Sequence, residues 1–120
     1  MNTILVADDK ASSRELVRTV LEHRGYVVIE AADGAEALAK ARENHLKLIL
    51  LDLQMPVLDG FGVIEQLRSE VRFAAIPIVA LTASAMHGDR EKALAAGFSG
   101  YITKPIRLAY LRSEVERLLA

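Results

Sequence analysis

The sequence predicts an α/β domain, a doubly wound parallel sheet of five strands with helices on both faces. Five short apolar segments alternate along the chain with five longer amphipathic ones. Most of the short segments are continuously apolar, which is typical of strands that are buried on both faces. Strands that alternate with helices form parallel sheets, and right-handed crossovers restrict the order of the strands.

The expected strands are short apolar runs, and several of them stop at a polar residue. We place them at Thr3–Ala7, Val27–Ala31, Leu48–Leu51, Ile78–Leu81 and Tyr101–Thr103. No linker, repeat or low-complexity segment interrupts the alternation of strands and helices. We therefore expect a single domain.

The expected helices carry apolar stripes and are flanked by residues that favour helix ends. We place them at about Ser12–Arg24, Gly34–Asn44, from Asp59-Gly60 onward, Asp89–Ala96 and Arg107–Leu119. The first stripe comprises Leu16, Val17, Val20 and Leu21, the third Val63, Ile64 and Leu67, and the last Leu108, Leu111, Val115, Leu118 and Leu119. Asp33 can cap the second helix, and Gly25 and Gly97 are expected to end the first and the fourth.

The composition restricts the functions that the chain can have. Its 120 residues are 52% hydrophobic and 26% charged, which is typical of one globular domain. A net charge of -1 gives no support to a nucleic-acid binder, and the lack of cysteine excludes disulfides and thiolate metal sites. Because the sequence has no signal peptide and no apolar run of membrane-spanning length, we expect a soluble cytoplasmic protein.

Polar side chains follow four of the expected strands. Asp8 and Asp9 follow the first strand, Asp52 the third and Thr82 the fourth, while Lys104 lies just after the fifth. Ligands of open α/β sheets bind at the carboxyl ends of the strands. These five side chains should therefore converge at one edge of the sheet.

The residue types at this edge indicate phosphoryl transfer. Three carboxylates repel one another unless a cation joins them, and oxygen ligands favour Mg²⁺, with Mn²⁺ as an alternative, over zinc. Lys104 adds a fixed positive charge and Thr82 a hydroxyl group. A metal, a cation and a donor around a nucleophilic carboxylate are the parts that phosphoryl transfer requires.

Four sequence blocks resemble the receiver domain of response regulators in two-component systems. They are Ile4–Asp9 (ILVADD), Leu50–Gly60 (LLDLQMPVLDG), Ala80–Ala83 (ALTA) and Gly100–Pro105 (GYITKP). The resemblance covers essentially the whole chain, so we expect one response regulator receiver domain over residues 1–120. It also implies the strand order 2-1-3-4-5 of flavodoxin-like folds, for which a chemotaxis receiver is a standard example.

The resemblance implies a role for each site residue. Asp52 would be the phosphoacceptor and would form an aspartyl phosphate. Asp9 would bind Mg²⁺ directly, Asp8 largely through water, and the backbone carbonyl of Gln54 would be a further ligand. Lys104 would pair with Asp52 at rest and with the phosphoryl group afterwards.

Further residues would serve the conformational switch and the shape of the site. Thr82 would bond a phosphoryl oxygen, and Tyr101 would then move inward, although a tyrosine on a strand is commonly half-buried packing. Pro105 would follow a cis Lys-Pro bond. Gly60 is expected to supply a backbone conformation that only glycine adopts.

The implied partners are proteins of a phosphorelay. A histidine kinase or a histidine phosphotransfer protein would donate the phosphoryl group, and a downstream protein would bind the surface of helix four, strand five and helix five. We expect no direct nucleic-acid or membrane contact. The domain would assist its own phosphorylation and dephosphorylation without turning over a separate substrate.

The form of the whole protein is left open by the resemblance. The run from Ala85 to Lys92 resembles receivers of hybrid kinases and of single-domain regulators. Met1, directly before the first strand, favours a stand-alone receiver over one excised from a longer protein. His23, His45 and His87 do not follow a strand, so we expect none to be a ligand or a phosphodonor.

Two other classes use related folds. A phosphatase of the haloacid dehalogenase type also has an Asp nucleophile and Mg²⁺, with a general acid two residues later. Here Lys10 and Gln54 stand two residues after Asp8 and Asp52, and neither can be that acid. A flavodoxin-like cofactor binder would need a phosphate-binding loop after the first strand, where Asp8 and Asp9 would repel the phosphate.

Overall fold

The structure, a computed structural model, describes residues 2–83 and 88–120. His87 and the start of the run that resembles hybrid-kinase receivers lie outside the described residues. The strands form one parallel sheet in the order β2-β1-β3-β4-β5, as expected. They are β1 (Thr3–Ala7), β2 (Val27–Ala31), β3 (Leu48–Asp52), β4 (Ile78–Thr82) and β5 (Gly100–Thr103).

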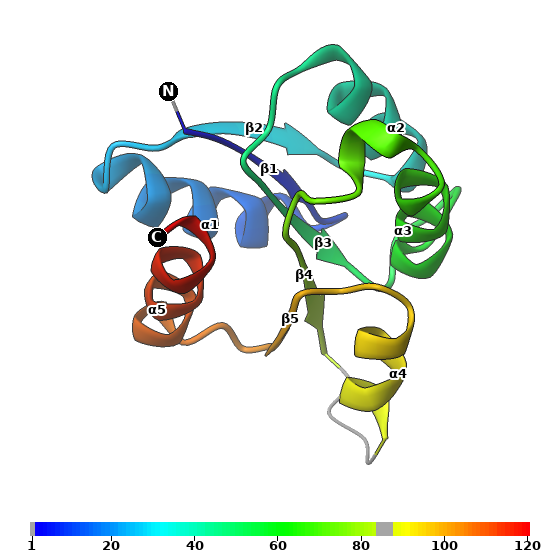
Figure 1. Ribbon diagram of the computed structural model, residues 1–120. Coiled ribbons are helices and arrows are strands. Elements are labelled where there is room, and N and C mark those ends of the chain that lie inside the picture. The colour runs from blue at the N-terminus through cyan, green and yellow to red at the C-terminus, as the bar shows by residue number, and fades with distance from the viewer. Residues whose placement is uncertain (1, 84–87) are drawn as a thin grey trace.

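Helices cover both faces of the sheet (Figure 1). Helices α1 and α5 lie on one face, and α2, α3 and α4 lie on the other. Their bounds are α1 (Ala11–His23), α2 (Gly34–Glu43), α3 (Gly60–Arg68), α4 (Asp89–Ala95) and α5 (Leu108–Leu119). A short 3-10 helix at Val71–Phe73, which the sequence did not predict, precedes β4.

The core is divided by the sheet into two layers. Along β3, Leu48 and Leu50 pack with α1 and α5, whereas Ile49 and Leu51 pack with α2 and α3. Successive side chains of a strand point to opposite faces, so each of the two layers receives alternate residues of the same apolar run. This explains why the central strands are continuously apolar.

The helix ends follow local sequence signals. Asp33 caps α2 by accepting a hydrogen bond from the amide of Glu36 (2.8 Å), and Asp59 caps α3 by accepting one from the amide of Gly62 (2.8 Å). Gly97, at φ 109°, ends α4 in a conformation that favours glycine. Within the described residues, no helix is both long and apolar enough to cross a membrane.

The apolar stripes are narrower than the sequence predicted. In α1 only Val17 and Leu21 are buried, and Leu16 is 43% exposed. In α5 only Leu111 and Val115 are buried, and Leu108 is exposed. Each of these helices touches the sheet along one line, so apolar residues at the margin of the stripe reach solvent.

The register of the sheet aligns the ends of the strands. Ala7 of β1 pairs with Leu51 of β3, and Asp52 pairs with Leu81 of β4. The residues that follow these pairs therefore emerge at one level, on the carboxyl edge of the sheet.

Candidate functional site

Three carboxylates gather at the carboxyl edge of the sheet. Asp8, Asp9 and Asp52 each offer a carboxylate oxygen, and these oxygens lie within 4.8 Å of one another. Asp8 and Asp52 are buried, whereas Asp9 is exposed. The convergence that the sequence predicted is therefore present for all three.

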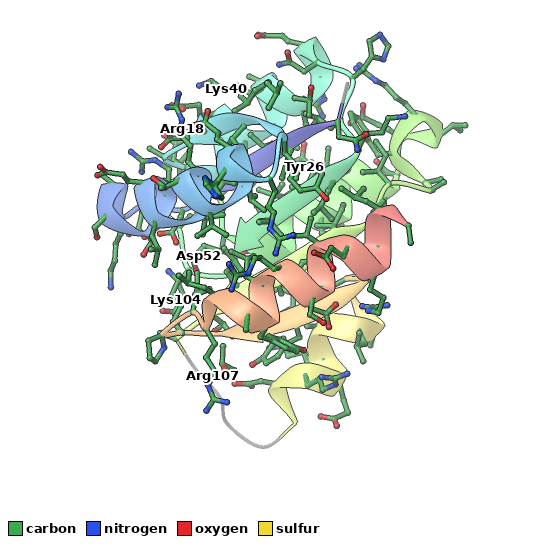
Figure 2. The ribbon with its side chains drawn as sticks, turned by 90° about the vertical axis from the view of Figure 1, so that its left-hand side faces the viewer. Arg18, Tyr26, Lys40, Asp52, Lys104 and Arg107 are labelled. Atoms are coloured by element: carbon green, nitrogen blue, oxygen red, sulfur yellow. The ribbon has the colours of Figure 1, made fainter. Side chains whose placement is uncertain are left out.

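Lys104 joins two of these carboxylates. Its Nζ lies 2.8 Å from Oδ2 of Asp52 and 2.8 Å from Oδ2 of Asp8. Figure 2 shows Asp52 and Lys104 near each other at the end of the sheet. The Lys104-Pro105 peptide bond is cis, as the resemblance implied, and the Lys104 amide donates to the carbonyl of Thr82 (2.7 Å).

The two buried carboxylates are held by backbone amides of their own loops. Asp52 Oδ1 accepts from the amide of Gln54 (2.9 Å), and Asp8 Oδ1 accepts from the amide of Lys10 (2.9 Å). Asp8 Oδ2 is fully buried, and its partner among the described residues is the ammonium group of Lys104 at 2.8 Å. A buried carboxylate needs positive charge beside it, so Asp8 is suited to bind a cation.

The charges of the site shift two pKa values. Burial raises the pKa of Asp52, against the lowering effects of Lys104 and of the Gln54 amide. Burial works to lower the pKa of Lys104, but its interactions with Asp52 and Asp8 outweigh this and raise the pKa above its usual value. Lys104 is therefore a permanent cation at neutral pH.

Thr82 and Tyr101 lie on neighbouring strands. Ala80 of β4 pairs with Tyr101 of β5, and both belong to the core layer on the face covered by α2, α3 and α4. Thr82, two residues after Ala80, faces the same side of the sheet. Thr82 is buried at the end of β4, and Tyr101 is only 8% exposed. Tyr101 thus occupies a largely inward position in this structure.

The prediction that Gly60 adopts a backbone conformation open only to glycine was wrong, because its φ is not positive. The glycine is needed for a close approach instead. A Cβ atom at this position would meet the carbonyl oxygen of Asp52 at 2.5 Å and Cα of Leu53 at 2.8 Å. The amide of Gly60 also donates to the carbonyl of Leu53 (3.1 Å). The start of α3 thus packs directly against the backbone that carries Asp52.

Two features of the site had no signal in the sequence. Val57, in the loop between β3 and α3, has φ 72°, which is a strained conformation for a β-branched residue. Arg14 of α1 donates to the backbone carbonyl of Asp8 (2.7 Å). Spacing and strand position give no sign of either, since neither residue follows a strand directly.

An acidic cluster that faces a lysine, on a parallel sheet in the order 2-1-3-4-5, defines a receiver domain. The chain belongs to the family of response regulator receiver domains, whose model matches residues 4–116. It is therefore a phosphoacceptor signalling domain of two-component systems. None of the comparisons supports the phosphatase of the haloacid dehalogenase type.

Curated relatives of two lengths match the chain. The probable transcriptional regulator ycf27 of Porphyridium aerugineum is 44% identical over 116 residues, which are 97% of this chain and 47% of the relative. The polar-differentiation response regulator DivK of Brucella ovis is 38% identical over 104 residues, 87% of this chain and 85% of the relative. This chain thus spans about half the length of the ycf27 relatives.

Solved receiver structures share the fold over nearly the whole chain. The chemotaxis response regulator CheY4 of Vibrio cholerae has a TM-score of 0.93 at 34% identity, with 99% of both chains covered. The receiver domain of the sensor histidine kinase PA1611 of Pseudomonas aeruginosa has a TM-score of 0.90 at 35% identity, covering 98% of this chain and 97% of that one. That structure holds a magnesium ion in its active-site cleft.

Proposed function

We propose that Asp52 accepts a phosphoryl group from the phosphohistidine of a histidine kinase or a histidine phosphotransfer protein. The observation that carries the proposal is the placement of Asp52 at the carboxyl edge, 2.8 Å from Lys104 and clustered with Asp8 and Asp9. A carboxylate oxygen of Asp52 attacks phosphorus, and the bond from phosphorus to the histidine nitrogen breaks. The histidine keeps that electron pair and leaves neutral once it is protonated.

The chain's residues serve this transfer by position and charge. The ammonium group of Lys104 lies where it can neutralise charge on the phosphoryl oxygens, as phosphoryl transfer requires. The amide of Gln54 fixes one oxygen of Asp52 and so orients the carboxylate. The same groups would support transfer from a small phosphodonor and later hydrolysis of the aspartyl phosphate.

We infer that Asp8, Asp9, Asp52 and the backbone carbonyl of Gln54 hold Mg²⁺, or Mn²⁺ in its place. When bound, this ion supplies positive charge that offsets the carboxylates and the phosphoryl oxygens. The three clustered carboxylates, two of which are buried, fit such an ion. The magnesium in the similar PA1611 receiver adds support.

The switch would run from Thr82 to Tyr101. Phosphorylation adds close to two negative charges and strong acceptor oxygens at Asp52. The Thr82 hydroxyl would donate to one of these oxygens, and Tyr101, already mostly buried, would be locked inward. The surface of α4, β5 and α5 would change in consequence.

This surface has the character of a protein-binding face. A cavity of about 740 Å³ opens there, and its lining includes Arg90, Tyr101, Arg107 and Tyr110. Arg107 marks this end of the molecule in Figure 2. The downstream partner is expected to be a protein, and a cytoplasmic location remains a prediction.

The test of the phosphoacceptor uses acetyl phosphate with Mg²⁺ and intact-mass spectrometry. The wild type should gain one phosphoryl group, and Asp52→Asn should gain none. Asp33→Asn is the matched control, because Asp33 also lies at the carboxyl edge and asparagine caps a helix as well as aspartate does. Equal uptake by Asp52→Asn and wild type would refute the assignment.

The metal site is tested by titration with Mg²⁺ followed by NMR. Asp9→Ala should weaken binding strongly, whereas Asp8→Ala should weaken it less if water replaces part of its role. Phosphorylation should stop when a chelator is added. Unchanged uptake in excess chelator would contradict the need for the ion.

A further inference from the structure

We propose that Arg14 of α1 is a positioning residue that fixes the Asp8-Asp9 peptide and thereby presents Asp9 to a divalent cation. The inference rests on the proposed function, because it concerns the same metal site. It is supported by a contact that the proposed function does not use: the Arg14 guanidinium links the backbone carbonyl of Asp8 to the side chain of Glu30.

The guanidinium spans two elements with two different donors. Its Nη1 donates to the carbonyl oxygen of Asp8 at 2.7 Å, and its Nε donates to Oε1 of Glu30 on β2 at 3.0 Å. The Arg14 side chain is only 17% exposed and that of Glu30 27% exposed. These contacts are therefore shielded from water more than those of an ordinary surface ion pair.

The carbonyl that Arg14 holds belongs to the peptide that carries the amide of Asp9. On the other side of Asp8, its amide donates to the carbonyl of Ala31 at 3.0 Å. The backbone of Asp8 is thus fixed at both ends, by β2 and by α1. Asp9 is exposed, and among the described residues its side chain has no hydrogen-bond partner. The position of its backbone therefore decides where its carboxylate can reach.

Glu30 is a firm anchor for Arg14. Its second oxygen accepts from Nη1 of Arg18 at 2.8 Å, and its backbone carbonyl accepts from Nζ of Lys40 at 2.6 Å. Arg18 and Lys40 lie on the same side of the molecule in Figure 2, away from Arg107. An arginine suits this task because its planar fork can bond a carbonyl and a carboxylate together, which a lysine ammonium does less well.

A role of Arg14 through its charge and a role through its position predict opposite changes in Mg²⁺ affinity when the residue is replaced. A cation near a metal site repels the metal, so its removal would tighten Mg²⁺ binding if charge were its only effect. If Arg14 instead positions the Asp8-Asp9 peptide, its removal weakens binding. Residues that orient metal ligands typically change metal affinity by about 10-fold to 100-fold when replaced.

The experiment compares Arg14→Gln with Arg18→Gln by Mg²⁺ titration of the full chain, followed by NMR. Both variants lose one positive charge from α1 and one ion pair with Glu30, but only Arg14 contacts Asp8. We expect Arg14→Gln to weaken Mg²⁺ binding about 10-fold and Arg18→Gln less than about 2-fold. Equal weakening in both variants, or tighter binding in Arg14→Gln, would overturn the proposal.

A second readout needs no metal. In the metal-free protein, the Lys10 amide, which donates to Oδ1 of Asp8, should exchange faster in Arg14→Gln than in wild type and at an unchanged rate in Arg18→Gln. Unchanged exchange in Arg14→Gln would show that Arg14 does not hold this peptide.

Arg14→Lys serves as the variant that preserves charge and packing. It should lie between wild type and Arg14→Gln in Mg²⁺ affinity, because an ammonium cannot link both acceptors equally well. Full wild-type affinity in Arg14→Lys would overturn the linkage. If the wild type itself bound no Mg²⁺, the proposed metal site would fail, whereas normal wild-type binding with unchanged affinity in Arg14→Gln would refute only the role of Arg14.

Discussion

Helices α3 and α4 pack on the same face of the sheet but are attached to it very differently. In α3, four residues are buried, namely Gly60, Val63, Ile64 and Leu67, whereas in α4 only Ala93 is buried. Figure 1 shows α4 at the periphery, beyond the last strands of the sheet. A helix with little buried apolar surface can shift at low cost, so α4 is suited to transmit a change and α3 to resist one.

The contacts that hold α4 involve residues of α3. The ring of Phe61 meets that of Phe98 edge-on at 6.0 Å, and Nζ of Lys92 lies 5.2 Å from the centre of the Phe61 ring. Arg68 donates to the carbonyl of Gly97 from Nε and Nη2, at 3.2 and 2.9 Å. Arg68 thus ties the carboxyl end of α4 to α3, next to the start of β5.

The largest difference in the free energy of unfolding is expected between the replacement of a buried residue of α3 and that of an exposed residue of α4. Ile64→Ala should lower the free energy of unfolding by about 3 kcal/mol, because it leaves a cavity in the core. Leu94→Ala should lower it by less than about 1 kcal/mol, since Leu94 is 43% exposed. Urea denaturation measures both, and similar losses would mean that α4 is as firmly packed as α3.

Removal of the tie between the helices should have the next largest effect. Besides Gly97, Arg68 donates to the carbonyls of Phe73 (2.7 Å) and Ile76 (2.8 Å), and burial lowers its pKa. Arg68→Met should cost about 2 kcal/mol, because it leaves these carbonyls without their donor.

Arg72→Met is the matched control for Arg68→Met. Arg72 also donates to two carbonyls, those of Arg42 and Asn44, but it is exposed. It should therefore cost less than about 1 kcal/mol. Hydrogen exchange in α4 should rise only in Arg68→Met, and equal exchange in both variants would show that Arg68 does not anchor α4.

A smaller change in the free energy of unfolding is expected when Asp52 is replaced. This residue ends β3, the strand that leads into the loop before α3. Burial raises the pKa of Asp52 above its ordinary value of 3.8, so the folded state loses stability as pH rises through the folded pKa of this group. Asp52→Asn should therefore raise the free energy of unfolding at neutral pH in the absence of metal, and the gain should vanish near pH 3.8. Denaturation from pH 4 to 7 with a chelator tests the sign, and a gain independent of pH would exclude this cause.

The smallest change in the free energy of unfolding is expected for Thr82→Ala, which should nevertheless abolish signal transmission. With Mg²⁺ and beryllofluoride, NMR shifts in the wild type should spread from Asp52 to α4 and to residues 101–112. Thr82→Ala should confine them to the carboxylate cluster, because it removes the hydroxyl but little core volume. Full spreading in Thr82→Ala would mean that Thr82 is not the link.

The fold could be predicted from the apolar runs that form the strands, and the site from the polar residues at the ends of these runs. Apolar runs defined the strands, and parallel pairing brings residues such as Asp52 and Thr82 to one edge whatever lies between them. The reason for Gly60 was missed because a close approach depends on the neighbouring backbone. The links made by Arg14 and Arg68 were missed because long side chains bond carbonyls of distant segments, and no periodicity marks such pairs.

The cap of α3 also bears on the chemical durability of the protein. An Asp-Gly peptide such as Asp59-Gly60 is prone to isomerise, since the glycine amide nitrogen can attack the preceding side chain and form a cyclic imide. Here the Asp59 carboxylate accepts from the amide of Gly62, and the amide of Gly60 donates to the carbonyl of Leu53. With both reacting groups occupied, the folded chain should age slowly at this bond, and isoaspartate should accumulate there only when α3 unfolds.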